Sequence, residues 1–420
     1  MTRPSGDWLG FAELSSESNR YKQVELVLSS ANFEHLKDRA LRSRRRHDTN
    51  ALPDLDCSIN LAQFTTGFDN LVLELAFSDD VFWIARIPHR AINDDTKTLL
   101  LSEIATLNII SQRTTIPVPR VFDFEMSSDQ PFGYPYVLMQ YLGGRTVTNG
   151  LADSIPQEHH SKVAKQLANV FAELQCLTFS RIGRLWCGET ADEPVEIIPM
   201  AWHHSPGPLG TSLEYFYHQR RGENREIMAL HPDDADWLTA CWVLNTAMGQ
   251  IVIEDRVQGP FPLCHLDLHF GNLLFDDEYN LTGVIDWSNA QAAPLEQLSV
   301  CPELVVFPGR SDEKNQPIVE FKKLVIHFLK VKEDEIVKAE SDREGGLFPL
   351  DQQQGTSEQS RRLTPLSAYM DSASAELMHR QYMASPKGSL WAGKRVAKLM
   401  YGENVSWEQL KGVYGRMSLG

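Results

Sequence analysis

The chain has 420 residues, of which 42% are hydrophobic and 23% charged, proportions typical of a globular enzyme long enough for two lobes. Its formal net charge of −16 argues against nucleic acid as a partner, because phosphate backbones are bound by basic faces. No apolar run approaches the roughly 18 residues of a membrane helix, the start lacks an apolar signal segment, and no two cysteines form a C-x-x-C pair. We therefore expect a cytoplasmic protein with reduced thiols that binds neither nucleic acid nor membranes.

Residues 1–50 are polar and predict a helical N-terminal extension. This extension carries a run of basic side chains at Arg39, Arg42, Arg44, Arg45 and Arg46. Such a run is either an interaction patch or nuclear signal, or a solvated helix face whose charges offset nearby acids. The second interpretation is favoured.

Residues 51–141 predict a small β-rich N-lobe. The runs Leu71–Phe77 and Val81–Ile87 surround the polar turn Ser78-Asp79-Asp80, a pattern typical of a β-hairpin. Residues 96–112 place apolar side chains on one face of a helix, and residues 115–125 and 134–142 each contain a further strand. Gly143-Gly144 follows as a hinge.

Residues 142–420 predict a larger, mainly helical C-lobe. Helical spacing is clear in residues 158–177 and 235–253, whereas the Pro- and Gly-rich residues 203–216 predict a loop. More helices are expected beyond residue 300, interrupted by a polar, mobile insertion at residues 340–362. The expected fold class is α+β, with a small β-rich lobe followed by a large helical lobe.

The clearest chemical motif is H-L-D-L-H-F-G-N at residues 265–272, followed by V-I-D-W at residues 284–287. Apolar runs around the turn D-D-E-Y-N predict a loop, a strand, a turn and a second strand that ends near Asp286. Phosphoryl transfer needs oxygen ligands for Mg²⁺ and one carboxylate that orients the attacking hydroxyl and accepts its proton. Asp267 suits the base and Asn272 and Asp286 suit the metal ligands, since the spacing Asp-x-x-x-x-Asn matches the kinase catalytic loop.

Two other interpretations of this motif exist. The three polar residues could lie in unrelated surface turns, although their joint spacing makes this the weaker interpretation. Alternatively, His265, Asp267 and His269 could be metal ligands of a hydrolase, which would require further ligands elsewhere and leave Asn272 and Asp286 unexplained.

The motif resembles that of the aminoglycoside phosphotransferase and choline kinase families, distant relatives of protein kinases, and in particular their fungal-type members. The resemblance covers roughly residues 55–310 and implies a two-lobed kinase-like fold, with ATP and Mg²⁺ as cofactors. It implies that Asp267 is the catalytic base and that Asn272 and Asp286 hold Mg²⁺. Leu266 and Phe270 stand where relatives usually have Gly and Pro, and neither change removes a chemical group.

The same resemblance implies a nucleotide site upstream. Q-F-T-T-G-F-D-N resembles the loop that covers the phosphates, with Gly67 as its one glycine and Asn70 at its end. Arg86 stands where kinases usually have the Lys that grips the α- and β-phosphates, and Glu103 would brace it. The backbone of Gln140 and Leu142 would contact adenine at the hinge.

The acceptor should contact the helical lobe. An acidic rim would suit a cationic acceptor, and its candidate residues are Trp202, His203, His204, Asp233, Asp234 and Asp236. The favoured alternative is structural, because D-D-A-D is also typical of a helix start. The resemblance implies a further helix start at Pro294-Leu295-Glu296. The expected function is an ATP- and Mg-dependent phosphotransferase acting on a hydroxyl group of a small molecule. The alternatives are a non-catalytic, pseudokinase-like module that binds nucleotide or ligand, and an enzyme that transfers an adenylyl group.

Overall fold

A computed structural model describes residues 3–49, 52–67, 69–90, 92–147, 155–200, 207–301, 304, 311–344 and 363–416. The chain divides into two compact units. The first unit comprises Met1–Thr148, Trp186–Val195 and Phe270–Ser288, and the second comprises Asn149–Leu185, Glu196–His269 and Asn289–Gly420. The lobe boundaries predicted after residues 50 and 141 stay a prediction.

A five-stranded antiparallel sheet forms the centre of the first unit. Its strands are β1 (Cys57–Thr66), β2 (Asn70–Phe77), β3 (Phe82–Pro88), β4 (Val121–Glu125) and β5 (Tyr136–Gln140), in the order β1-β2-β3-β5-β4. The predicted hairpin of β2 and β3 is confirmed, since Leu71 pairs with Ile87 and the Phe77 N–H donates to the Val81 carbonyl at 2.9 Å. β1 was not predicted as a strand.

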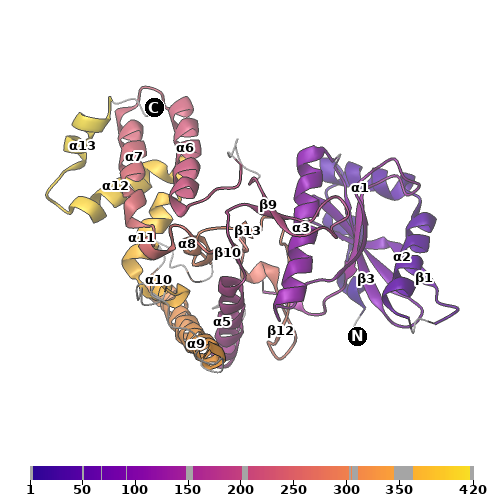
Figure 1. The fold of residues 1–420 in the computed structure, drawn as a ribbon. Helices are drawn as coiled ribbons and strands as arrows, with labels where there is room; N and C mark the ends of the chain where they lie inside the picture. The colour runs from indigo at the N-terminus through magenta and orange to yellow at the C-terminus, as the bar shows by residue number, and fades with distance from the viewer. Residues whose placement is uncertain are drawn as a thin grey trace. The chain divides into compact units, whose positions relative to one another are not determined.

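Helices cover both faces of this sheet (Figure 1). They are α1 (Asn19–Ser30), α2 (Phe33–His47) and α3 (Asp94–Arg113). Successive side chains of a strand point to opposite faces, so Trp83 and Ala85 of β3 pack towards α1 and α2, whereas Ile84 packs towards Ile104 of α3. Arg86 is two residues beyond Ile84 and therefore lies on the α3 face.

Two of the arginines in the basic run tie α2 to its own unit. Arg39 donates two hydrogen bonds to Asp123, at 3.0 and 2.8 Å. The buried Arg44 forms ion pairs with Asp48 at 2.6 Å and with Asp79 at 3.0 Å. Both arginines offset nearby acids, as the favoured interpretation expects, but Arg44 does so from a buried position and not from a solvated helix face.

The start of the chain lies over the edge strand β1. Two short 3₁₀ helices, η1 (Pro4–Asp7) and η2 (Gly10–Glu13), pack against this part of the sheet. Gly10 has a φ of +58°, and a Cβ at this position would lie only 2.5 Å from the carbonyl oxygen of Ala62, so only glycine fits. Phe11 packs edge-on against Phe64 of β1, with ring centroids 4.9 Å apart.

A second sheet of the first unit follows the motif. It contains β6 (Arg145–Thr146), β11 (Leu273–Phe275) and β12 (Leu281–Val284), in the order β12-β11-β6. β11 and β12 pair antiparallel, with Leu273 opposite Val284. The predicted strand, turn and strand after the motif are therefore confirmed.

The second unit is mainly helical. Within the described residues, its helices of six or more residues are α5 (His160–Cys176), α6 (Ser212–Leu230), α7 (Ala235–Thr246), α9 (Asp312–Glu344), α10 (Leu366–Asp371), α11 (Ala373–Tyr382), α12 (Ser389–Tyr401) and α13 (Trp407–Tyr414). The one-turn helix α8 (Leu295–Leu298) begins where the sequence predicts a helix start. The short strands are β7 (Thr178–Phe179), β8 (Arg184–Trp186), β9 (Glu196–Ile198), β10 (Phe261–Cys264) and β13 (Gln291–Ala292). With a β-rich first part and a helical second part, the predicted α+β class is confirmed.

One helix of this unit corrects a prediction. Residues 203–216 were expected to be a loop, but α6 begins at Ser212. Thr211 and Glu214 form a capping box, in which each side chain accepts a hydrogen bond from the backbone N–H of the other residue. These two hydrogen bonds stabilise the first turn of the helix, so the helix begins although Pro and Gly residues directly precede it. Residues 201–206 lie outside the described part.

The helix predicted within residues 158–177 is α5, and its apolar residues at helical spacing are buried, namely Val163, Leu167, Val170, Phe171 and Leu174. Of the predicted insertion, residues 340–344 form the end of α9 and residues 345–362 lie outside the described part. All six cysteines lie in described ranges, and none forms a disulfide. No described helix is long and apolar enough to cross a membrane.

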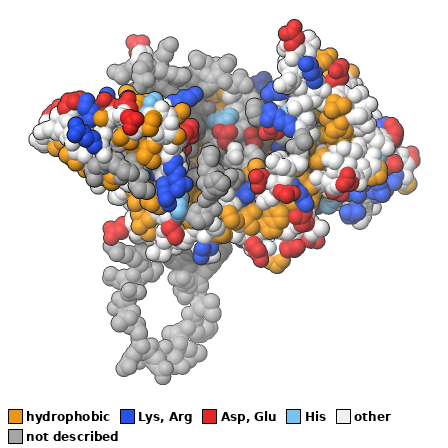
Figure 2. All heavy atoms as spheres, turned by 90° about the horizontal axis from the view of Figure 1, so that it is seen from above, with side chains coloured by type: hydrophobic (Ala, Val, Ile, Leu, Met, Phe, Trp, Pro, Cys, Tyr) orange, Lys and Arg blue, Asp and Glu red, His pale blue; other side chains and the backbone are white. Residues whose placement is uncertain are grey.

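Acidic and basic side chains are interspersed on the face of the molecule that Figure 2 presents.

Candidate active site

The predicted contact between Arg86 and Glu103 is present in the first unit. Arg86 of β3 donates from Nη1 to Oε1 of Glu103 on α3 at 2.6 Å. Glu103 is buried, whereas 21% of the Arg86 side chain is exposed. Burial alone would lower the pKa of Arg86, but the charge and hydrogen bond of Glu103, followed by the charge of Asp286, raise it above its ordinary value. The guanidinium is therefore held cationic beside two carboxylates.

The two predicted metal ligands lie close together along the backbone of the same unit. Asn272 is buried in the one-turn helix η6 (Phe270–Asn272), and its carbonyl accepts the N–H of Ile285 at 2.9 Å. Ile285 directly precedes Asp286, so this hydrogen bond holds the two ligand residues on neighbouring strand ends. Asp286 is exposed and accepts a hydrogen bond from the Ser288 hydroxyl at 2.8 Å.

Asp286 has a left-handed backbone, with a φ of +62°. Few residues other than glycine adopt this conformation, and those that do are often found at functional sites. The next side chain fixes the strand end, because Trp287 is fully buried and donates from Nε1 to the Val284 carbonyl at 2.9 Å. The carboxylate of Asp286 is thus presented to solvent from a rigid turn.

Asn272 and Asp286 supply the donors that Mg²⁺ prefers, one amide oxygen and one carboxylate. Among the described residues, no three His, Cys, Asp or Glu side chains are grouped so that they could hold a metal ion. A cation here would need phosphate and water oxygens to complete its coordination, which is the usual state of Mg²⁺ at a nucleotide. The residues therefore fit a magnesium ion that arrives with a nucleotide.

The predicted base, Asp267, belongs to the second unit. It follows β10 and is half-buried, and its backbone N–H donates to Nδ1 of His265 at 3.3 Å. The carbonyl of His265 also accepts the Leu268 N–H at 3.1 Å, so His265 braces the loop. His269 lies beside the carboxylate, with Nε2 at 3.7 Å from Oδ2 of Asp267.

The predicted phosphate loop connects β1 and β2. The N–H of Gly67 donates to the carbonyl of Asn70 at 3.0 Å, which closes the connection, and Phe68 lies outside the described residues. A Cβ on Gly67 would meet no atom within 4 Å, so the space beside this glycine is open within the first unit. The approach of a phosphate to this backbone stays a prediction.

The predicted hinge packs on the hairpin that holds Asn272 and Asp286. The backbone N–H of Gln140 donates to the carbonyl of Arg120 at 2.8 Å, so this N–H is already occupied. Leu142 lies so close to Gly283 of β12 that a Cβ there would be 2.8 Å from its Cδ1. Gly144, at a φ of +122°, has no room for a Cβ beside Thr282.

The acidic rim proposed for the acceptor is structural in two of its members. Asp234 is the N-cap of α7 and accepts the N–H groups of Asp236 and Trp237. The side chain of Asp236 accepts Nε1 of Trp407 at 2.5 Å, the first of several contacts that lower its pKa. These two acids begin a helix and anchor α13, as the structural alternative predicts. Trp202, His203 and His204 lie outside the described residues.

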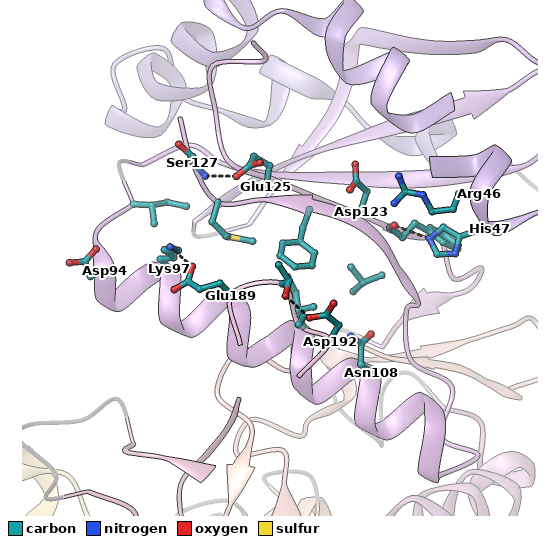
Figure 3. A pocket seen from close by; sticks show the side chains of 18 of the residues that line it. Arg46, His47, Asp94, Lys97, Asn108, Asp123, Glu125, Ser127, Glu189 and Asp192 are labelled. Carbon is teal, nitrogen blue, oxygen red and sulfur yellow. Dashed lines mark hydrogen bonds and ion pairs between the residues drawn. The ribbon is translucent and has the colours of Figure 1, made fainter. Parts of the chain in front are cut away.

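A groove of about 830 Å³ lies elsewhere in the first unit, between α3, β4 and residues 189–192. Figure 3 shows Lys97 and Glu189 joined across it. Its acidic lining residues are Asp94, Asp123, Glu125, Glu189 and Asp192. No predicted site residue lines this groove, and Asp123 and Glu189 already bind Arg39 and Lys97, so it is separate from the candidate active site.

A buried charge on the sheet face of Arg86 was not predicted from the sequence. Glu74 lies in the middle of β2 with only 2% of its side chain exposed, and it accepts hydrogen bonds from Arg3 and from the backbone of Ser5. A glutamate inside the apolar run L-V-L-E-L-A-F was the available signal, because a charge at a buried strand position needs a partner.

Comparison with known proteins gives a family. Residues 60–297, more than half of the chain, match the phosphotransferase enzyme family (APH). Altered inheritance of mitochondria protein 9 of Zygosaccharomyces rouxii is 24% identical over 146 residues, which are 33% of this chain and 24% of that protein. A subtelomeric hrmA-associated cluster protein of Aspergillus fumigatus is 26% identical over 161 residues, or 38% of this chain and 31% of that protein. The chain thus spans less than a third of the length of either curated relative.

Among solved structures, the macrolide 2′-phosphotransferase of Brachybacterium faecium is similar over 92% of this chain and 99% of its own, with 16% identity and a TM-score of 0.43. The match to the family rests on the sequence, and it covers the motif, the hinge and the Arg86–Glu103 pair. The chain belongs to the phosphotransferase enzyme family, with the protein-kinase-like α+β fold that the motif predicts.

Proposed function

We propose that this chain transfers the γ-phosphoryl group of ATP, in the presence of Mg²⁺, to a hydroxyl group of a small molecule. The observation that carries the proposal is the ion pair of Arg86 and Glu103, together with the influence of Asp286 on the same guanidinium. A cation on the sheet, braced by a buried carboxylate and close to a candidate metal ligand, suits the binding of a metal-bound triphosphate.

Arg86 would bind the α- and β-phosphates through its guanidinium. Planar guanidinium groups form strong, often bidentate hydrogen bonds with phosphate oxygens. Glu103 fixes the side chain, because the 2.6 Å contact occupies Nη1 and leaves the exposed part of the guanidinium to face a ligand. The arginine in place of the usual lysine is thus compatible with phosphate binding.

Asn272 and Asp286 would hold Mg²⁺ through the amide oxygen and the carboxylate. When bound, Mg²⁺ supplies positive charge that offsets the charge of the phosphate oxygens. The backbone hydrogen bond between Ile285 and Asn272 keeps the two residues in register for this task.

Asp267 would orient the acceptor hydroxyl and take its proton. The acceptor oxygen then forms a bond to the γ-phosphorus, while the bond between that phosphorus and the bridging oxygen of ADP breaks. The proton goes to the carboxylate of Asp267, and ADP leaves with the bridging oxygen. The brace from His265 to the Asp267 backbone would keep the carboxylate in place.

Two phosphotransferases that resemble this chain at 13% identity were solved with ADP, and with ATP and streptomycin, bound. Their TM-scores are 0.41 and 0.43. The nucleotide and the acceptor of this chain are therefore questions for experiment. The acceptor class proposed here is limited to a hydroxylated small molecule, of which cationic ones are the first to screen because of the net charge of −16.

Thermal unfolding with ATP or ADP, each with and without Mg²⁺, tests the proposal. A nucleotide that binds the folded chain raises its Tm with concentration, by an amount equivalent to about 2.7 kcal/mol at a hundredfold excess over Kd. We expect a Mg²⁺-dependent rise that Asp286→Ala removes. Asp277→Ala is the matched control, because Asp277 is an exposed acid on the same hairpin that pairs only loosely with Arg145 at 3.5 Å.

Turnover then separates an enzyme from a binding module. Once an acceptor supports ADP release, Asp267→Asn should lower turnover by about 10²–10⁴ while nucleotide binding persists. Nucleotide binding without ADP release for any hydroxylated acceptor would favour the non-catalytic module, and release of pyrophosphate would favour adenylyl transfer. No Tm rise at millimolar nucleotide would contradict the proposal.

A further inference from the structure

Glu74 is a buried carboxylate that the proposed mechanism does not use. Its Oε1 accepts Nε of Arg3 at 2.7 Å, and its Oε2 accepts the backbone N–H of Ser5, also at 2.7 Å. Burying a carboxylate is costly unless it is paired and hydrogen-bonded, and these two donors satisfy it. Glu74 therefore binds Arg3 and Ser5 to the sheet.

Strand register places Glu74 on the face that carries Arg86. Glu74 lies opposite Ile84 of β3, and Ile84 lies opposite Met139 of β5. Arg86 belongs to the neighbouring row of the same face, two residues farther along β3. At about 3.4 Å per residue, the two rows are roughly 7 Å apart.

The hinge lies at the Glu74 end of this face. Gln140 pairs with Trp83, one residue from Ile84 and on the side away from Arg86. A nucleotide whose phosphates meet Arg86 and whose base meets the backbone of Gln140 must therefore extend across the row of Glu74, Ile84 and Met139.

The segment bound by Glu74 flanks this row. η1 packs against β1 and β2, and β2 is the neighbour of β3, which carries Ile84. Ser5 is fully buried, and its hydroxyl lies 3.5 Å from Oε1 of Gln63 on β1. The hinge residue Tyr141 also senses the charges of this region. Burial raises its pKa most, and the negative charges of Glu74 and Asp7 raise it further.

We propose that residues 3–7, held by Glu74, form the wall of the nucleotide site beside the base. Arg3 and Glu74 are then positioning residues for the nucleotide, a role that rests on the proposed function. Without the guanidinium of Arg3, the carboxylate of Glu74 would face a polyanionic ligand uncompensated and would lose the partner that keeps η1 in place. Nucleotide affinity should fall for both reasons.

The test is the Kd of Mg-ADP, measured by calorimetry on the full chain. Arg3→Ala should weaken binding about tenfold, the equivalent of one lost hydrogen bond to a charged group. Arg3→Lys should restore most of the affinity, because an ammonium can still pair with the carboxylate. More than half of the Arg3 side chain is exposed, so these variants should fold, and urea unfolding of each variant checks that they do.

A double-mutant cycle isolates the charge. In a Glu74→Gln background, Arg3→Ala should raise the Kd of Mg-ADP about threefold or less, since no uncompensated carboxylate remains. Lys37→Ala is the matched control: it removes another cation of this unit that pairs with an acid, Glu34, and should leave the Kd unchanged.

The possible results separate this inference from the function it rests on. If the unaltered chain does not bind Mg-ADP, the proposed function fails and the wall fails with it. If the chain binds Mg-ADP but Arg3→Ala binds it equally well, only the wall is overturned. Tighter binding by Arg3→Ala would also overturn it, because the segment would then obstruct the base site instead of bordering it.

Discussion

Buried charges have different partners in the two units. In the first unit, the buried glutamates Glu74 and Glu103 each contact a guanidinium, at 2.7 and 2.6 Å. In the second unit, the buried Arg220 donates to neutral acceptors, the carbonyls of Tyr382 and Ala384 and the side-chain oxygen of Asn224. Burial also lowers the pKa of Arg220, whereas that of Arg86 is raised.

The two arginines also differ in their exposure to solvent. The Arg86 side chain is partly exposed, so its guanidinium can add phosphate oxygens without leaving Glu103. Arg220 is enclosed, and its hydrogen bonds join α6 to the chain between α11 and α12. Arg86 thus keeps part of its guanidinium exposed, whereas Arg220 holds segments of the second unit together.

Arg220→Met should break this second arrangement with the largest effect on stability. The change leaves several buried acceptors without a donor, and we expect the free energy of unfolding to fall by about 3–4 kcal/mol. Urea unfolding measures it. Arg225→Met, at an exposed position of the same helix, is the control and should change stability by less than about 0.5 kcal/mol. Equal effects at both positions would show that Arg220 is not an anchor.

His379→Phe sharpens the comparison through pH. Neither ring nitrogen of the buried His379 has a hydrogen-bond partner among the described residues, and burial lowers its pKa to about 4. As the pH falls from about 6.5 to 4, the unfolded chain therefore takes up a proton before the folded chain does, and stability is lost over this window. At pH 5 the loss should be about 2 kcal/mol.

Phe should remove this loss and keep the edge-on ring contact with Phe216, whose centroid is 5.6 Å from that of His379. Urea unfolding at pH 7 and pH 5 measures the difference between the two proteins. Burial raises the pKa of Glu296 to about 7, so its protonation stabilises the folded chain as the pH falls. Both proteins contain Glu296, so its contribution cancels in the comparison. Parallel pH profiles would contradict the assignment to His379.

Glu103→Gln should have the smallest effect on stability, about 1 kcal/mol. Water reaches part of Arg86 and screens its charge, and the Gln side-chain oxygen can still accept a hydrogen bond from it. The measurement is again urea unfolding, beside Arg220→Met. A loss of 3 kcal/mol or more would mean that the first unit, too, uses its buried charge mainly for stability.

Much of the fold was predictable from local patterns. The hairpin of β2 and β3, the helices α3 and α5, and the hairpin of β11 and β12 all have a strong period or a clear turn, so short stretches of sequence determine them. β1 has neither. It is an edge strand with only Cys57 and Phe64 buried, and an irregularity between Ile59 and Phe64 breaks its alternation.

The candidate site was predictable in its residues more than in its contacts. The motif identified Asp267, Asn272 and Asp286 by spacing, and the resemblance identified the pair of Arg86 and Glu103. The partner of Glu74 was beyond sequence reasoning, because Arg3 is 71 residues away and only the wrapping of the chain start around β1 brings it there. The catalytic, nucleotide and metal roles of all these residues stay predictions.

The position of η2 over β1 also bears on how the protein behaves at high concentration. An edge strand offers unpaired backbone groups to the edge of another molecule, and exposed edges are common starting points of aggregation. Gly10 lies against the Ala62 carbonyl and Phe11 against Phe64, so the chain start shields this edge. A shortened chain that begins after residue 13 should therefore be less soluble than the full chain, even if it folds.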